Sequence, residues 1–368
     1  MFTRCPLSYL LGTEHLQVDA LPAGPFAIRG TAVHEVIEKF IGMDDVPGAM
    51  IKSAVCESLK RLIDTASTSS LMKWVYERHG LDGIFSRQYL VDVCAFVKQT
   101  IKDYPNPRQT SSGGTGKALT GGNLSKLGTE KWFHSERFDL AGRVDLTFRE
   151  GNDSIHVVDY KTGQILDDDG EPKDDFILQV AAYGVVVKEI LGVGTIVLEL
   201  VGPKTKWRGE LDPHLEGRVE SLVNRIKSEL PRGELLDRER LAVVGRHCQT
   251  CSYRPACKNY LQIIRNGPSE TAVGAISDFD ITGSLLKINS AGDLVDLRAL
   301  TPDGRTISIN SVPLVLVPRS TEVGCEISAF GLGSLEIPGR ARVPGNFYVF
   351  KRDDPKKSAF NSMLIFRK

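Results

Sequence analysis

A predicted β-hairpin in the middle of the chain constrains the fold most. The runs Phe138–Phe148 and Ile155–Lys161 are β-type and are joined by Arg-Glu-Gly-Asn-Asp-Ser. In a hairpin centred near Asn152, residues whose numbers sum to 304 face each other, so Asp145 is expected opposite Asp159. Opposed residues hold their Cβ atoms about 4.5–5.5 Å apart, which allows two carboxylates to share a divalent cation.

The same register separates a charged face of the hairpin from an apolar face. Asp159 and Lys161 are two residues apart and therefore share a face, and Arg143 is expected opposite Lys161. A cation beside the carboxylates and a phosphate beside the cationic side chains would relieve both like-charge pairs. The other face carries residues for a core: Val144, Leu146, Phe148, Val158 and Tyr160. The alternative is an exposed hairpin with ordinary surface charges.

Two predicted helices, one on each side of the hairpin in sequence, carry further polar residues. The segment from Gly30 to Phe40 has apolar residues at helical spacing and contains His34. Gln179 and Tyr183 are four apart on a helix expected from Asp174 or Asp175 to Leu191, so they share a face. Taken alone, His34 is typical of a structural histidine. Gln179 and Tyr183, taken alone, are typical of the half-buried polar edge of a packing helix.

Three cysteines near residue 250 have metal-binding spacing. They are Cys248, Cys251 and Cys257, and three thiolates leave a tetrahedral site one ligand short. His247 is one residue that could complete a zinc site. Seven cysteines without a secretory leader favour free thiols or metal thiolates in a reducing compartment, so a cytoplasmic location is expected. No run of 18 apolar residues occurs, and no membrane association is expected.

Length and charge bound the remaining organisation. The 368 residues suffice for two domains, and we expect a division into residues 1–265 and 266–368. Lys+Arg and Asp+Glu number 46 each, so any phosphate-binding surface must be a local cluster. Residues 104–128 are rich in Gly, Ser and Pro and are predicted to form a mobile loop.

The last hundred residues have a different composition. Five short β-type runs with Gly- and Pro-rich connections suggest a small β-barrel, of the OB type. Near its end lies an aromatic and basic cluster: Phe347, Tyr348, Phe350, Lys351 and Arg352. Such residues suit a grip on single-stranded nucleic acid, although aromatic residues in a small barrel also form its core.

Four motifs in order resemble RecB-like nucleases of the PD-(D/E)XK superfamily. They are Gly30-Thr-Ala-Val-His34, Gly142-Arg-Val-Asp145, Val157-Val-Asp-Tyr-Lys161-Thr-Gly163 and Gln179-x3-Tyr183. The resemblance covers about residues 1–265. It implies an α/β fold with a restriction-endonuclease-like core, in which helices flank a mixed sheet.

The resemblance also implies roles for individual residues. His34, Asp145 and Asp159 would be metal ligands, together with the Tyr160 carbonyl. Lys161 would be the catalytic lysine, and Gln179 and Tyr183 would support the site or the DNA. Glu130 matches, loosely, an acidic residue that often precedes Gly-x-x-Asp, with Glu136 as a nearby alternative. Oxygen-bound Mg²⁺ would activate the attacking water, and a histidine ligand shifts the preference toward Mn²⁺.

The N-terminal segment Cys5-Pro-Leu-Ser-Tyr resembles one half of a split iron–sulfur motif. That motif occurs in AddB-type and CRISPR-associated RecB-like nucleases, and it implies a [4Fe–4S] cluster on Cys5, Cys248, Cys251 and Cys257. Zinc is the alternative. Closing a loop between residues 5 and 248 removes about 5 kcal/mol of unfolded-chain entropy, so the cluster's first role would be structural.

The function expected from these features is a metal-dependent deoxyribonuclease, an exonuclease on single-stranded or end-containing DNA. It would act in repair, recombination or defence. The sequence lacks Gly-x4-Gly-Lys-[Ser/Thr], so a helicase activity would come from a partner subunit. One alternative is a catalytically inactive scaffold that binds single-stranded nucleic acid. Another is a zinc-stabilised adaptor protein.

Overall fold

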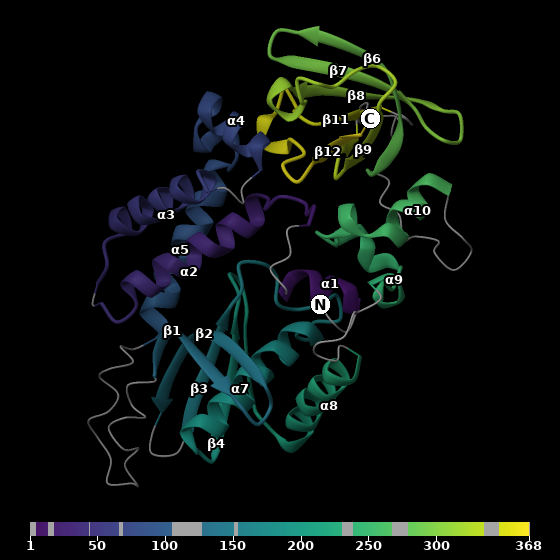
Figure 1. Ribbon diagram of the computed structural model, residues 1–368. Helices are drawn as coiled ribbons and strands as arrows, with labels where there is room; N and C mark the ends of the chain where they lie inside the picture. Colours follow the sequence, from purple (N-terminus) through teal and green to yellow (C-terminus); the bar gives the residue numbers. More distant parts are fainter. Residues whose placement is uncertain are drawn as a thin grey trace. The chain divides into compact units, whose positions relative to one another are not determined.

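The chain forms two compact units, each assembled from separated parts of the sequence (Figure 1). The computed structural model describes residues 5–13, 18–43, 45–65, 69–104, 127–150, 154–229, 238–266, 279–334 and 346–367. The central unit comprises Arg29–Leu59 and Gln88–Pro231, and the terminal unit comprises Met1–Ile28, Lys60–Arg87 and Arg232–Lys368. Residues 105–126 of the predicted mobile loop at 104–128, and the hairpin turn at 151–153, lie outside the described residues. The predicted division at residue 265 stays a prediction.

A mixed five-stranded sheet forms the core of the central unit. Its order is β1-β2-β3-β4-β5, and β3 and β4 are its parallel pair. The strands are β1 (Gly128–Ser135), β2 (Leu140–Glu150), β3 (Ser154–Tyr160), β4 (Thr195–Val201) and β5 (Lys206–Glu210). Two parallel neighbours need a crossover, and α7 (Asp174–Leu191) supplies it. The mixed α/β architecture expected from the sequence is therefore confirmed.

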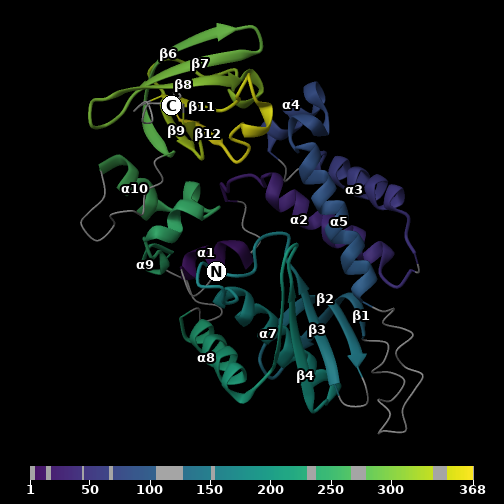
Figure 2. The same cartoon turned by 180° about the vertical axis from the view of Figure 1, so that it is seen from behind.

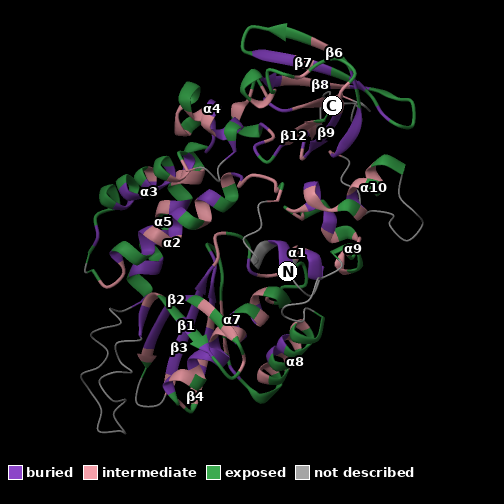
Figure 3. Cartoon of the chain, in the orientation of Figure 1, coloured by how far each residue is buried: buried purple, intermediate pink, exposed green. Residues whose placement is uncertain are grey.

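Helices pack against this sheet. Helix α7 contacts β4, β1, β3 and β2, and α8 (Pro213–Glu229) packs on α7 (Figures 1 and 2). Gly184 permits the close approach of α7, because a Cβ there would lie 2.8 Å from a methyl of Leu198. Most of α2 (Pro25–Phe40), α3 (Gly48–Ile63) and α5 (Arg87–Asp103) also belongs to this unit. Figure 3 shows that the buried residues gather in the central strands.

The pairing of β2 with β3 confirms the predicted register. Leu146 faces Val158, and the next pairs along the ladder keep the same sum of residue numbers. The ladder ends at this pair, one position before Asp145 and Asp159. Asp145 bridges the two strands differently, since its Oδ2 accepts a hydrogen bond of 2.6 Å from the backbone N–H of Tyr160. The apolar face expected from the sequence is buried throughout.

A seven-stranded sheet dominates the terminal unit, in the order β10-β11-β8-β7-β6-β9-β12. The strands are β6 (Ile281–Ala291), β7 (Leu294–Leu300), β8 (Thr306–Pro313), β9 (Glu326–Phe330), β10 (Gly333–Ser334), β11 (Asn346–Tyr348) and β12 (Met363–Arg367). The predicted OB-like barrel is not confirmed. In the described part of the chain, β10 and β12 are the edges of one sheet, and no ladder joins them.

Short helices complete the terminal unit. They are α1 (Pro6–Thr13), α4 (Ser70–His79), α9 (Arg238–Leu241) and α10 (Lys258–Asn266), with 3₁₀ turns at Arg246–Thr250 and Arg254–Ala256 around the cysteines. A buried ion pair between Arg254 and Asp280 ties the cysteine segment to the start of β6. Within the described residues, no helix is long and apolar enough to cross a membrane.

Candidate functional site

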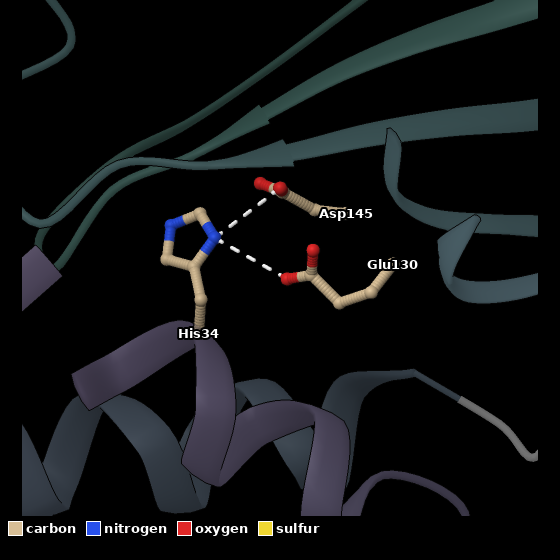
Figure 4. A group of neighbouring side chains, drawn as sticks. All are labelled: His34, Glu130 and Asp145. Atoms are coloured by element: carbon tan, nitrogen blue, oxygen red, sulfur yellow. Dashed lines mark ion pairs between the residues drawn. The ribbon is translucent and has the colours of Figure 1, made fainter. Parts of the chain in front are cut away.

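Side chains from a helix and two strands of the central unit converge at one point (Figure 4). His34 comes from α2, Glu130 from β1 and Asp145 from β2. The His34 Nδ1 lies 3.2 Å from Asp145 Oδ1 and 3.6 Å from Glu130 Oε1, while its Nε2 lies 3.0 Å from the Tyr160 carbonyl oxygen. One ligand atom from each of the three side chains lies within 4.8 Å of the other two, so the group could hold a metal ion.

Glu130 takes part in this group, although the sequence matched it only loosely to the site. The group does not include Asp159, which was predicted as a ligand. Glu130 has a left-handed backbone, with φ of 51°, which costs a residue other than glycine about 1–3 kcal/mol. Arg143 forms an ion pair with Glu130. Lys161 has an acidic partner of its own, Asp159. The predicted opposition of Arg143 and Lys161 lies beyond the last pair of the β2–β3 ladder and stays a prediction.

The two carboxylates dominate the electrostatics of the group. Burial would lower the pKa of His34, but hydrogen bonds and charge from Asp145 and Glu130 outweigh it and raise that pKa to about 10. The imidazolium thus supplies the positive charge that two buried carboxylates require. A divalent cation would serve the same purpose and would release the proton from the histidine.

Asp159 lies beside the group and is 2% exposed. Burial raises its pKa to about 6; the Lys161 ammonium opposes this shift, and the charge of Asp145 adds to it. The Lys161 Nζ lies 2.6 Å from Asp159 Oδ2, but without hydrogen-bond alignment. Among the described residues, this buried oxygen makes no aligned hydrogen bond, although the Lys161 ammonium lies beside it.

A relay of side chains holds the Lys161 ammonium in place. Lys161 Nζ donates to Gln179 Oε1 at 2.8 Å, and Gln179 Nε2 donates to the Tyr183 hydroxyl at 3.0 Å. Gly142 leaves room for the tyrosine, because a Cβ there would lie 2.6 Å from Cε1 of its ring. The backbone N–H of Lys161 donates to the Val201 carbonyl at 2.9 Å, which extends the parallel pairing beyond β3.

Comparison with known proteins decides the family of this chain. The sequence profile of the PD-(D/E)XK nuclease superfamily matches residues 1–258. The chain belongs to the PD-(D/E)XK nuclease superfamily.

Solved structures similar to this PD-(D/E)XK protein include a proposed exonuclease from Eubacterium rectale. It is 12% identical with a TM-score of 0.27, over 53% of this chain and 74% of that one. A second, SSO0001, is 11% identical with a TM-score of 0.26, over 62% of this chain and 95% of that one. No curated protein matches the chain.

The four predicted cluster cysteines of this PD-(D/E)XK protein all lie in the terminal unit. Cys5 and Cys248 are buried, and Cys251 and Cys257 are half-buried. Burial is the largest cause that raises the pKa of the Cys257 thiol to about 11, and the charges of the other three thiols act in the same direction. Cys257 packs against two apolar clusters, one that contains Cys5 and one that contains Cys248.

The surroundings of the thiols bear on which residues could serve as ligands. The Gly245 N–H donates to Cys248 Sγ at 3.5 Å, a contact that stabilises a thiolate. The Cys251 thiol contacts the Ser8 hydroxyl at 3.8 Å. His247, the alternative zinc ligand, directs its Nε2 to the Val243 carbonyl oxygen at 2.8 Å.

Strand β1 was missed by the sequence reasoning, and the place of Glu130 was missed with it. The strand reads Gly-Thr-Glu-Lys-Trp-Phe-His-Ser, in which polar and apolar residues do not alternate cleanly. The available signal was the acidic residue ahead of Gly-x-x-Asp. The pairing of β1 with β2 explains why that acidic residue belongs to the site. Thr129 faces Leu146 and Lys131 faces Val144, so Glu130 lies beside Asp145.

Proposed function

We propose that this chain is a divalent-metal-dependent deoxyribonuclease, an exonuclease that acts on single-stranded DNA or DNA ends. One observation carries the proposal: three potential metal ligands converge beside a buried carboxylate oxygen and a held lysine ammonium. Membership of the PD-(D/E)XK nuclease superfamily supports hydrolysis of phosphodiester bonds. The preference for DNA and the exonucleolytic mode are part of the proposal.

The donor set suits a hard divalent cation. His34, Glu130 and Asp145 would hold it, with Asp159 and the Tyr160 carbonyl oxygen as the further ligands predicted from the sequence. Carboxylate and carbonyl oxygens favour Mg²⁺ or Mn²⁺, and the imidazole shifts the preference toward Mn²⁺. The buried Asp159 Oδ2 is the observation that favours this fit. When bound, the metal supplies Lewis acidity and lowers the pKa of a coordinated water.

Lys161 would act on the phosphate. Its side chain is 17% exposed and its ammonium is held by Gln179, so the ammonium is fixed in position before a substrate arrives. A fixed cation at the place where negative charge develops stabilises the transition state without reorganisation. Tyr183 acts through Gln179, because its hydroxyl accepts from the amide nitrogen and thereby fixes which end of the amide faces the lysine.

We further propose that the four thiols of the terminal unit bind a [4Fe–4S] cluster, as in AddB-type and RecB-like relatives. The packing of Cys257 against the apolar clusters of Cys5 and Cys248 and the N–H···S contact at Cys248 support this assignment. As an AddB-type or RecB-like nuclease, the chain would work in the cytoplasm, in DNA repair, recombination or defence. A helicase or another subunit would be its partner. The cluster would be a structural clamp on the N-terminus. Zinc is the second candidate.

The decisive experiment compares the wild type with Lys161→Ala and a matched control, Lys227→Ala, at an exposed lysine of α8. Single strands labelled at the 5′ or 3′ end are incubated with Mn²⁺, Mg²⁺ or chelator. Loss of one preorganised electrostatic donor slows such reactions by about 10²–10³-fold, so Lys161→Ala should be slow and the control unchanged. If wild type and Lys161→Ala degrade the strands equally slowly with Mn²⁺, the result would favour the inactive binding scaffold.

The cofactor assignment has a separate test. Protein purified without oxygen should be brown and contain iron and sulfide, and Cys5→Ser should lose both. A colourless protein with stoichiometric zinc would instead support the adaptor alternative. The nuclease assay and the metal analysis are independent, so either part of the proposal can fail alone.

A further inference from the structure

A cavity of about 570 Å³ lies in the terminal unit, apart from the residues of the nuclease site. It opens beside β8, β10 and β11 and the segment that follows β11. Its volume is within the range of about 300–1,000 Å³ that small-molecule and cofactor sites occupy. Aromatic side chains line part of it, namely Phe279, Tyr348 and Phe350, and basic side chains line another part, namely Lys351, Arg352 and Lys357.

The aromatic wall is held rigidly. A Cβ on Gly333 would lie 2.4 Å from Cζ of Tyr348, so the missing side chain is what lets the ring lie against β10. The Tyr348 hydroxyl donates to the Lys357 carbonyl oxygen at 3.1 Å. Phe350 packs edge-to-face on Trp74 with ring centroids 4.9 Å apart. A flat apolar ligand would therefore meet a preformed surface.

The basic wall has an excess of positive charge. Three cations line the cavity with one carboxylate, Asp353. The Lys357 ammonium lies 3.5 Å from Asp354, but both side chains are exposed, and such a pair contributes little. The backbone N–H of Lys351 donates to Ser358 Oγ at 3.1 Å, which fixes the start of the basic segment. Because the chain as a whole has zero net charge, this excess of positive charge is local to the cavity.

We propose that this cavity binds single-stranded nucleic acid, with one base against Tyr348 and the flanking phosphates on Lys351, Arg352 and Lys357. A base that stacks on an aromatic ring and a backbone that follows cations are the two components of single-strand binding. A duplex keeps its bases stacked inside and cannot insert one without unpairing it. The inference rests on the proposed function in one respect, the choice of DNA as the strand.

The test measures binding of a labelled oligothymidine to the full chain by fluorescence anisotropy over a range of salt concentrations. All proteins carry Lys161→Ala so that the strand stays intact. The cavity variant changes Lys351, Arg352 and Lys357 to glutamine. The control variant makes the same change in charge at exposed residues of the same sheet unit: Lys287, Arg298 and Arg319. Tyr348→Leu and Tyr348→Phe test the aromatic wall.

Three lost phosphate contacts should lower the slope of log affinity against log salt by about 2, since each contributes about 0.7 on a single strand. We expect at least tenfold weaker binding for the cavity variant and little change for the control. Tyr348→Leu should weaken binding several-fold, while Tyr348→Phe, which keeps the ring, should not. Circular dichroism checks that each variant is folded.

Some outcomes would overturn the inference. If both triple variants weaken binding equally, the loss of affinity comes from the lower net charge of the protein and not from this cavity. Equal affinity for a duplex and a single strand would also reject it. Nuclease activity is read separately: if wild type cleaves and Lys161→Ala does not, the proposed function stands even when the cavity variant binds normally. Cavity-specific binding without any cleavage would support the cavity as a single-strand site and reject the proposed nuclease function.

Discussion

Removal of the Asp280 carboxylate should lower the stability of the terminal unit more than a substitution at its surface. The side chain is fully buried, and it accepts hydrogen bonds from Arg254 Nε at 2.5 Å and Arg254 Nη2 at 3.1 Å. It also accepts from the Tyr260 hydroxyl at 2.7 Å and from the Gly331 backbone N–H at 2.7 Å. In Asp280→Ala, all four donors lose this acceptor at once.

The expected cost follows from what is left behind. Arg254 is 5% exposed, so its guanidinium would remain buried without its counter-charge. Breaking a buried ion pair by removing one partner costs about 3–5 kcal/mol. A buried hydroxyl or N–H without an acceptor adds about 1–3 kcal/mol each. Together these costs are a large fraction of the free energy of unfolding of a typical domain, which is roughly 5–15 kcal/mol.

A double variant separates the charge from the packing. Arg254→Met with Asp280→Leu removes both charges and restores apolar volume, and such replacements are often neutral or stabilising. The double variant should therefore unfold at a higher urea concentration than Asp280→Ala. Asp280→Asn, which keeps an acceptor oxygen, should fall between wild type and Asp280→Ala.

Tryptophan fluorescence can report on the terminal unit alone. Of the three tryptophans, Trp74 lies in this unit, and Trp132 and Trp207 lie in the central unit. With the latter two changed to phenylalanine, urea unfolding is followed through Trp74. An unchanged midpoint in Asp280→Ala, or a double variant no more stable than it, would refute the reasoning.

Three further predictions concern the central unit. Gly142→Ala should displace the Tyr183 ring, since the new Cβ would lie 2.6 Å from it, and should lower kcat of DNA cleavage with the fold intact. Burial opposes ionisation of Glu199, but hydrogen bonds from His156 and Tyr104, together with the charges of His156 and Arg208, outweigh it and lower the Glu199 pKa. The stabilisation from Glu199 is therefore present above the ordinary pKa of 4.5 and is lost as pH falls through the lower, folded value. Glu199→Gln should flatten that acid-side loss in urea titrations. Finally, Mn²⁺ should raise the Tm of the wild type, and His34→Ala should weaken this shift.

Each of these predictions has a matched control in the same unit. Gly217→Ala, at a helical position with open space around it, should leave cleavage unchanged. Glu210→Gln, at an exposed carboxylate, should keep the acid-side loss of stability. His134→Ala, at an exposed histidine of β1, should keep the full Mn²⁺ shift. If a control behaves like its test variant, the corresponding physical reason is wrong.

The strands and helices that the sequence predicted are those with clear local periodicity. Helix α7 ends at Leu191, as expected. At the start of α7 the N-cap residue is Lys173, and Asp174 and Asp175 lie in the first turn. The missed elements include β5, α4 and β12. Strand β12 pairs with β9, more than thirty residues earlier, and nothing within five residues signals such a partner.

The hairpin shows where local pattern is sufficient and where it is not. Alternation along β2 and β3 specifies the register, because a slip by one residue would move every side chain to the other face. It therefore also specifies that Asp145 and Asp159 approach each other at the end of the ladder. By contrast, the ladder's early end and the hydrogen bond from Tyr160 N–H to Asp145 depend on how the strands separate there.

Residue types and their spacing were enough to point to a metal site, a catalytic lysine and a cysteine cluster. Tertiary structure decided that Glu130 stands beside His34 and Asp145, and that Arg143 forms an ion pair with Glu130. It also set the aromatic and basic cluster near the end of the sequence beside Phe279, Asn310 and Gly333 in one cavity. The physical reason is range: periodicity and register act between neighbours in the chain, whereas ligand groups, ion pairs and cavities arise where packing brings separate segments together.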